Sequence, residues 1–177
     1  MNGSEFDNRV LGGQHVLTSK TLLLVRHAKS SWKNEELGDI DRPLSKRGFR
    51  DGPDMGKRLS VRLLIPELIV SSPAVRALST AGAIGKETGY TDEIIVEDNL
   101  YGAAPQEVLD LISEFDDFLR VVMIVLHNPT ITELANMFSV KSIENVPTCG
   151  VLVIEVSAWS RVAKARLTDF DYPKNLA

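Results

Sequence analysis

The sequence predicts an α/β domain, and three features of the chain carry that prediction. Short aliphatic runs alternate with segments in which apolar residues recur at helical spacing. The runs have the length of buried strands, and the one at 121–126 (VVMIVL) is the most hydrophobic. Basic residues and histidines follow several runs directly, where an open sheet places its ligand crevice. Such a pattern is typical of a sheet with helices packed on it.

The first half of the chain predicts three strands and two helices. A strand at 21–25 precedes a polar loop and a helix at about 45–64, which Gly52-Pro53 is expected to interrupt. A short strand at 67–70 precedes a helix that runs to about residue 87, with Ser72 as its N-cap and Pro73 in its first turn. A weak strand follows at 94–96.

The second half predicts two helices and three strands. Pro105 opens a helix, and the strand at 121–126 leads into another helix whose start, TITE at 130–133, fits a capping box. Closing strands are expected at 151–156 and 163–167. Cys149 is the only cysteine, so it forms no internal disulfide and is expected to be a small buried hydrophobe.

Composition bounds the class of protein. The 177 residues are 44% hydrophobic and 25% charged, which fits one globular domain, expected over residues 21–177. The net charge of −4 argues against a nucleic-acid partner, and no apolar run approaches the roughly 20 residues that cross a membrane. Residues 1–20 lack the apolar core of a secretory signal and include GSEF, which resembles a cloning remnant. We expect a disordered tail there, with His15 as a bystander.

The single cysteine favours a reducing compartment, and a monomer is the favoured oligomeric state. The expected compartment is the cytoplasm, or the interior of an organelle such as a plastid or mitochondrion if a transit peptide was removed. Charge is spread unevenly, because residues 26–62 hold ten of the twenty Lys and Arg against six acids. Most of this helical charge is expected to be a solvated face, with Lys46 and Arg47 near the mouth of a pocket.

Three positions at strand ends form a candidate site. Arg26 and His27 follow LLLV, Arg76 lies one helical turn past LIVSSP, and His127 follows VVMIVL. Carboxyl ends of parallel strands meet at one edge of a sheet, so these side chains are expected to share a pocket. Arginine forks match phosphate oxygens in pairs, and histidine can serve as a nucleophile in phosphoryl transfer.

Other interpretations of the same residues remain. A single histidine after a strand is often structural, and a lone helical arginine is often a surface ion-pair partner. A metal site is a further alternative, because histidine is a common ligand. Residues 21–177 contain only two histidines, and adjacent guanidinium groups would repel a metal ion. Phosphate is therefore favoured over metal.

The motifs RHAKS, SSPAVRALSTA and VLHNPT, in this order, resemble the histidine phosphatase superfamily, also called phosphoglycerate mutase-like. RPLSKRG at 42–48 and LYGA at 100–103 resemble its short branch, the phosphohistidine phosphatases. The resemblance implies a three-layer α/β/α sandwich with a mostly parallel central sheet. It also implies that His27 is the nucleophile, that Arg26, Arg76 and His127 complete the phosphate pocket, and that Ser30 contacts the substrate.

The chain departs from the family pattern in several places. Ala28 and Lys29 replace the glycine and glutamate of RHGES, and LH replaces the usual GH at His127. The glutamate that serves many members as general acid has no clear counterpart in VEDNLYGAAPQE. Asp98 is the candidate for that role. Glu97 is interpreted as a solvated loop residue, and Glu107 as an acid in the first turn of a helix.

Three further residues near the first motif have both a functional and a structural interpretation. Asp39 and Asp41 could orient a substrate or bind a cation, although capping and solvation are favoured. Trp32 fits a rim aromatic and a core-packing residue equally well.

Taken together, the sequence predicts a phosphatase that needs no metal or cofactor and works through a phosphohistidine at His27. The favoured substrate is phosphohistidine, a phosphoramidate, in a protein. The alternatives are a phosphatase for small phosphorylated metabolites and a non-catalytic phosphate-binding module, while a mutase is disfavoured by the short chain and the missing acid.

Overall fold

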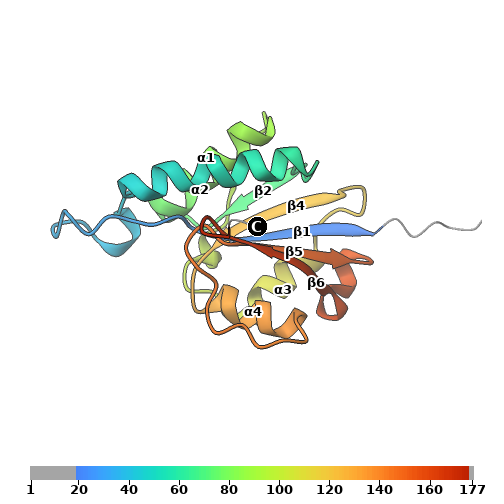
Figure 1. Ribbon diagram of the computed structural model, residues 1–177. Coiled ribbons are helices and arrows are strands. Elements are labelled where there is room, and N and C mark those ends of the chain that lie inside the picture. The colour runs from blue at the N-terminus through green and yellow to red at the C-terminus, as the bar shows by residue number, and fades with distance from the viewer. Residues whose placement is uncertain (1–18, 176–177) are drawn as a thin grey trace, which may run out of the picture.

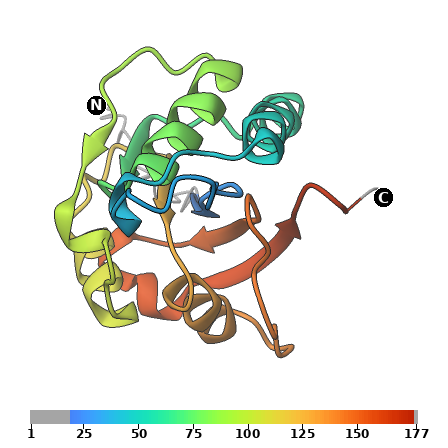
Figure 2. The same ribbon diagram turned by 90° about the vertical axis from the view of Figure 1, so that its left-hand side faces the viewer.

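The computed structural model describes residues 19–175 and has a six-stranded sheet between two layers of helices (Figure 1). Figure 2 shows the same layers from the end at which the first strand terminates. The three-layer α/β/α prediction is confirmed. The strands are β1 (Lys20–Arg26), β2 (Leu68–Ser71), β3 (Ile95–Val96), β4 (Val121–Leu126), β5 (Val151–Val156) and β6 (Arg166–Asp171). The helices are α1 (Lys46–Val61), α2 (Val75–Thr88), α3 (Pro105–Ser113) and α4 (Thr130–Phe138), with 3₁₀ turns η1 (Asp39–Asp41), η2 (Asp98–Leu100) and η3 (Trp159–Lys164).

The sheet has the order β3-β2-β4-β1-β5-β6 and is mostly parallel. β1 pairs with β4 in parallel, β2 pairs in parallel with both β4 and β3, and β5 runs antiparallel to its neighbours β1 and β6. In the β1–β4 register Arg26 lies opposite Leu126. The residues that follow them, His27 and His127, therefore leave two neighbouring strands at the same level.

The core has one half on each face of the sheet. Leu22 and Leu24 of β1 pack toward α3 and α4, whereas Leu23 and Val25 pack toward α1 and α2. All four are fully buried, because β1 is a central strand with helices over both faces. Burial on both faces explains why the sequence here is continuously aliphatic and does not alternate.

α1 is one continuous helix, so the predicted interruption at Gly52-Pro53 is wrong. Ser45 caps it by accepting a hydrogen bond from the Gly48 N–H at 3.3 Å, and Pro53 lies inside it. The glycines serve close packing. A Cβ on Gly48 would lie 2.3 Å from the backbone oxygen of Lys29, so α1 presses against the loop that follows the first motif.

Both predicted hydroxyl caps are wrong, because the hydroxyl groups have tertiary partners. α2 starts at Val75, and the Ser72 hydroxyl contacts His127. α4 starts at Thr130, whose hydroxyl donates to the carbonyl of Ala103 at 2.5 Å. Glu107 does accept from the Ala104 N–H at 2.7 Å at the start of α3, as expected for a first-turn acid.

Two smaller differences concern the ends of the domain. β6 begins at Arg166 and not at residue 163, because residues 159–164 form η3, which buries Trp159 and Val162. β1 begins at Lys20, one residue before the expected boundary, and the tail predicted over 1–20 falls almost entirely outside the described residues. Within residues 19–175, no helix is long and apolar enough to cross a membrane.

Candidate active site

Two histidines face one another at the carboxyl ends of β1 and β4. The ring centroids of His27 and His127 are 5.0 Å apart, and each residue is only 8% exposed. Arg76, in the first turn of α2, donates from Nε to Nε2 of His27 at 3.3 Å. The structure thus brings together three of the residues that the sequence singled out, from three separate elements.

The hydrogen bonds of His27 define which ring nitrogen carries the lone pair. Nδ1 lies 2.8 Å from the carbonyl oxygen of Ala28, which can only accept, so the proton is on Nδ1. Nε2 is then the unprotonated atom. Burial lowers the pKa of His27 to about 3, helped by the charges of His127, Arg76 and Arg26 and opposed by the Ala28 carbonyl. His27 is therefore neutral at pH 7, with its lone pair on Nε2, where it accepts a hydrogen bond from Arg76.

His127 has an open hydrogen-bonding atom inside the site. Its Nε2 lies 2.7 Å from the Ser72 hydroxyl, which also accepts from the Ala74 N–H at 3.4 Å. If the Ser72 hydroxyl donates to Nε2, the neutral ring carries its N–H on Nδ1. Nδ1 is buried and has no hydrogen-bond partner among the described residues. Burial, followed by the charge of Arg76, lowers the pKa of His127 to about 4.

Asp39 and Tyr101 hold the guanidinium of Arg76 in place. One Nη of Arg76 donates to the carboxylate of Asp39 at 2.8 Å, and the other donates to the backbone oxygen of Asp39. The Tyr101 hydroxyl donates to the same carboxylate at 2.7 Å, and this bond is the first cause of a lowered pKa at Asp39. Three of the five N–H groups of Arg76 are occupied, so two remain for a ligand.

Arg26 lies beside the pair of histidines, and its charge lowers the pKa of both rings. One Nη donates to the backbone oxygen of Val146 at 2.7 Å and to the side chain of Asn145 at 3.3 Å. Its Nε is buried without a hydrogen-bond partner among the described residues. Buried donors without partners are costly, so the site is built for a ligand that supplies acceptors.

Ser30 joins this arrangement through Arg42. Ser30 is buried and accepts from Arg42 at 3.0 Å, and Arg42 in turn pairs with Asp39 at 3.1 Å. The guanidinium of Arg42 lies 3.4 Å from the ring centre of Trp32, which is 68% exposed. Trp32 is therefore a rim aromatic that stacks on Arg42, not a core residue.

The candidate general acid is not in contact with the histidines. Asp98 lies in the exposed turn η2, and its side chain makes no hydrogen bond or ion pair within the described part of the chain. Glu97 accepts from the Asn99 N–H at 3.1 Å and caps the same turn. Asp41 is exposed in η1, as expected of a solvated loop residue.

Sequence reasoning missed three contributors to the site. The local sequence favours a cap or a solvated loop for Asp39 and a helix cap for Ser72, and Tyr101 stands out only as part of LYGA. The local sequence gives little indication of these roles, because each of the three residues bonds to a partner far along the chain. The charged pattern DIDRPLS was the one local sign that the loop carries more than solvated acids.

No group of three or more His, Cys, Asp or Glu side chains between residues 19 and 175 is arranged to hold a metal ion. The guanidinium groups of Arg76 and Arg26 lie beside the histidines, and guanidinium groups attract anions. Cys149 is fully buried, as expected, and burial raises the pKa of its thiol to about 12.

The two histidines should make the fold sensitive to acid. Their folded-state pKa values lie below the ordinary 6.5, so the unfolded chain binds protons that the folded chain does not as the pH falls from 6.5 toward 4. We expect the free energy of unfolding to fall over that window by up to about 1.4 kcal/mol per pH unit for each histidine. Asp39 contributes only below its ordinary pKa of 3.8, because its pKa is lowered.

Urea denaturation at a series of pH values measures this effect. A His27→Asn/His127→Asn double variant should lose less stability between pH 6.5 and 4 than the parent. An equal loss in the two proteins would show that other groups set the acid sensitivity.

Comparison with known proteins shows which family the chain belongs to. The family model of the histidine phosphatase superfamily (branch 1) matches residues 22–103, which include both arginines and the first histidine of the site. An uncharacterised protein of Mycobacterium tuberculosis is 31% identical over 163 residues, covering 85% of this chain and 100% of its own. The chain belongs to the histidine phosphatase superfamily. The resemblance drawn from three motifs is thereby confirmed.

Solved structures of histidine phosphatases agree with this assignment. The chain matches a structure from Agrobacterium tumefaciens, described as the phosphohistidine phosphatase SixA, with a TM-score of 0.75 and 29% identity. That match covers 87% of this chain and 98% of the other. A protein histidine phosphatase SixA bound to tungstate has the same fold, with a TM-score of 0.78 at 18% identity, over 89% of this chain and 99% of its own.

Proposed function

We propose that this histidine phosphatase acts through a phosphohistidine at His27 and that its substrate is phosphohistidine in a protein. The observation that carries the proposal is the state of His27, whose Nδ1 is held by the Ala28 carbonyl while its neutral Nε2 faces Arg76. A neutral, oriented ring next to a guanidinium suits nucleophilic attack on a phosphoryl group. The likeness to the SixA structure from Agrobacterium tumefaciens supports the substrate class.

In the proposed first step, Nε2 of His27 attacks phosphorus, the N–P bond forms, and the bond to the leaving group breaks with its electron pair. The free N–H groups of Arg76, the buried Nε–H of Arg26 and Nδ1–H of His127 donate to the phosphoryl oxygens, where negative charge is concentrated. Water then attacks the phosphohistidine and releases inorganic phosphate, which regenerates neutral His27. Nε of Arg26 and Nδ1 of His127 are buried without a hydrogen-bond partner among the described residues, which supports this role.

The carboxyl group that the site does hold, that of Asp39, is ion-paired with Arg76 and has a lowered pKa, so it is a poor proton donor, which supports a phosphoramidate substrate. A departing alkoxide is strongly basic and normally needs a proton from the enzyme. A departing imidazole has a conjugate acid of pKa about 6.5, so it is protonated near neutral pH without a dedicated acid. The Asp98 side chain makes no hydrogen bond or ion pair within the described residues, and its role as a general acid stays a prediction. Ser30 stays a predicted substrate contact, here bonded to Arg42.

We expect kcat/KM to decrease from phosphohistidine to aryl phosphate to alkyl phosphate. The order follows the basicity of the leaving group, since a phenolate leaves far more readily than an alkoxide. One enzyme preparation assayed on all three classes measures it, and Asp98→Asn should hurt the alkyl substrate most if that residue acts at all. An alkyl phosphate as the best substrate would favour the small-metabolite alternative, and absence of turnover on every class would favour a non-catalytic module.

We also expect turnover without a metal ion. The guanidiniums of Arg26 and Arg76 supply the positive charge that a metal would otherwise bring to the phosphoryl oxygens. Activity should survive exhaustive treatment with a chelator, followed by assay in metal-free buffer. Loss of activity that one divalent metal restores would overturn this part of the proposal.

A further inference from the structure

A basic groove lies next to the site and shares Arg26 with it. The groove has a volume of about 760 Å³, and six basic side chains line it against two acidic ones, although the whole chain has a net charge of −4. Neither histidine belongs to it. Its basic residues are Arg26, Lys29, Arg47, Arg50, Arg58 and Lys174.

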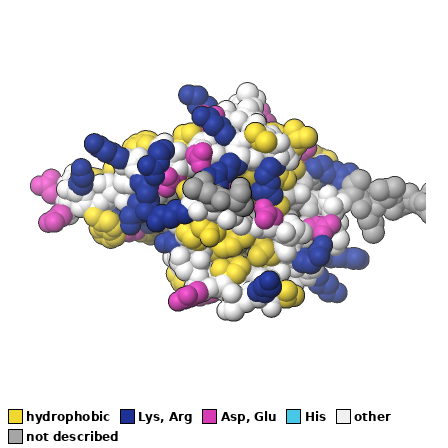
Figure 3. All heavy atoms as spheres, viewed as in Figure 1, with side chains coloured by type: hydrophobic (Ala, Val, Ile, Leu, Met, Phe, Trp, Pro, Cys, Tyr) yellow, Lys and Arg dark blue, Asp and Glu magenta, His cyan; other side chains and the backbone are white. Residues whose placement is uncertain are grey.

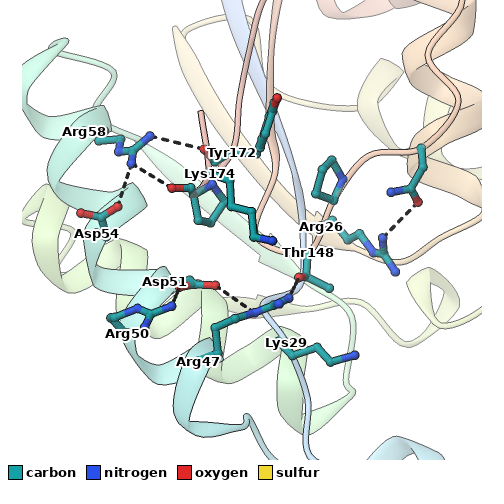
Figure 4. A pocket seen from close by; sticks show the side chains of 13 residues that line it. Arg26, Lys29, Arg47, Arg50, Asp51, Asp54, Arg58, Thr148, Tyr172 and Lys174 are labelled. Atoms are coloured by element: carbon teal, nitrogen blue, oxygen red, sulfur yellow. Dashed lines mark hydrogen bonds and ion pairs between the residues drawn. The ribbon is translucent and has the colours of Figure 1, made fainter. Parts of the chain in front are cut away.

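The walls of the groove come from segments far apart in the sequence (Figure 4). α1 forms one side with its arginines, while Tyr172 and Lys174 of the C-terminal segment and Thr148 lie across from it. Basic side chains also gather over the α1 region of the surface in Figure 3. The expectation that these helical cations are mostly a solvated face is therefore too simple, because several of them line a concave surface.

Buried Asp51 orients two of the arginines. It pairs with Arg50 at 3.1 Å and with Arg47 at 3.5 Å, and Arg47 also donates to the Thr148 hydroxyl at 2.8 Å. The side chains of Arg50 and Arg47 remain 74% and 44% exposed, so both keep N–H groups toward the groove. A single buried carboxylate cannot neutralise both guanidiniums, which leaves net positive charge at this wall.

Arg58 has a different task, which is to tie the C-terminal segment to α1. It pairs with Asp54 at 3.0 Å and Asp171 at 3.2 Å and donates to backbone carbonyl groups between residues 172 and 175. The side chains of Lys29 and Lys174, by contrast, make no hydrogen bond or ion pair with any described residue. These two lysines are the cations most available to a ligand.

We infer that this groove binds an acidic segment of the polypeptide that carries the phosphohistidine. Its volume suits several residues of a peptide and exceeds what one small anion fills. Arginine and lysine clusters recognise acidic segments, and a concave cationic surface concentrates anions. The acidic remainder of the surface disfavours a long nucleic acid. Arg26, common to groove and site, would place the acidic residues next to the reacting phosphoryl group.

The claim that the acidic segment belongs to the substrate rests on the proposed function. The claim that the groove binds an acidic peptide is independent of the proposed function. A fluorescent hexaglutamate peptide without phosphate therefore serves as the first probe, read by anisotropy. We expect saturable binding that weakens with added salt. A Lys29→Gln/Lys174→Gln variant should weaken it about tenfold. The matched control, Lys86→Gln/Lys164→Gln, changes the net charge equally at exposed positions outside the groove.

Equal weakening by the groove and control variants, or absence of binding, would overturn the inference. Tighter binding of a single-stranded oligonucleotide of matched charge would overturn the choice of a polypeptide. In a second experiment, phosphohistidine peptides with acidic and with basic flanking residues are compared as substrates. The acidic peptide should have the higher kcat/KM, and Lys29→Gln/Lys174→Gln should reduce that preference.

An unchanged preference in the groove variant would refute the substrate role. Failure to turn over either peptide, with hexaglutamate binding that depends on the two lysines, would count against the proposed function and still support the groove as a site for acidic peptides.

Discussion

The His27→Ala variant should be folded and should lose turnover by about 10⁴-fold or more. The proposed reaction requires a nitrogen lone pair at this position, and alanine removes it together with the bond to the Ala28 carbonyl. His127 is not held in the same way, because no carbonyl group fixes a proton on its Nδ1 and its Nε2 is bonded to Ser72. Steady-state rates on phosphohistidine and on an aryl phosphate measure the loss.

His15→Ala is the matched control, because His15 is the remaining histidine of the chain and lies outside the described residues. It should leave kcat and KM unchanged. Circular dichroism and thermal melting confirm that the His27 variant is folded. Substantial residual turnover in a folded His27→Ala protein would remove His27 from the nucleophile's role.

Arg76→Lys should lower kcat/KM by about a hundredfold or more, although the charge is conserved. Lysine is a point charge without the planar fork, so it cannot bond His27, Asp39 and a phosphoryl oxygen at the same time. Both kcat and the affinity for inorganic phosphate should fall, because the guanidinium serves positioning as well as charge. Kinetics with an aryl phosphate and inhibition by phosphate separate the two effects.

Arg166→Lys is the matched control for this change. Arg166 pairs with Glu155 at 3.1 Å on an exposed edge of the sheet, where arginine and lysine are nearly equivalent. It should leave the rate unchanged. If Arg76→Lys were as active as this control, Arg76 would not grip the phosphoryl group.

The meeting of the two histidines could be predicted from the sequence, because each directly follows an aliphatic strand. Parallel register then places them side by side, and no side-chain detail is needed. The continuous hydrophobicity of these strands likewise indicated burial on both faces. The positions of the helices followed from the periodicity of their apolar residues. The errors were the predicted interruption of α1 at Gly52-Pro53 and the predicted caps at Ser72 and Thr130.

The partners of polar side chains could not be predicted in the same way. Ser72 precedes a proline and a helix, so its local sequence favours a cap, yet its hydroxyl bonds His127, 55 residues away. Asp39 is 37 residues from Arg76. The hydrogen-bond partner of such a side chain depends on which group the fold brings nearest. Hydroxyl and carboxylate groups can bond to several different partners with similar energy, so the local sequence does not decide among them.

The groove illustrates the same limit. The sequence places three of the six cations, Arg47, Arg50 and Arg58, on one helix, and a helix face alone predicts solvation. Only the fold shows that the C-terminal segment at 172–174 and the loop at 145–148 lie opposite that face.

Trapping of the phosphorylated enzyme tests the central claim most directly. The protein is mixed with substrate, quenched in alkali within the first turnover, digested, and the phosphate is located by mass spectrometry and NMR. We expect an acid-labile phosphate on Nε2 of His27, because Nδ1 is hydrogen-bonded to the Ala28 carbonyl. A phosphate on Nδ1 or on another residue, or turnover without a phosphoenzyme, would contradict it.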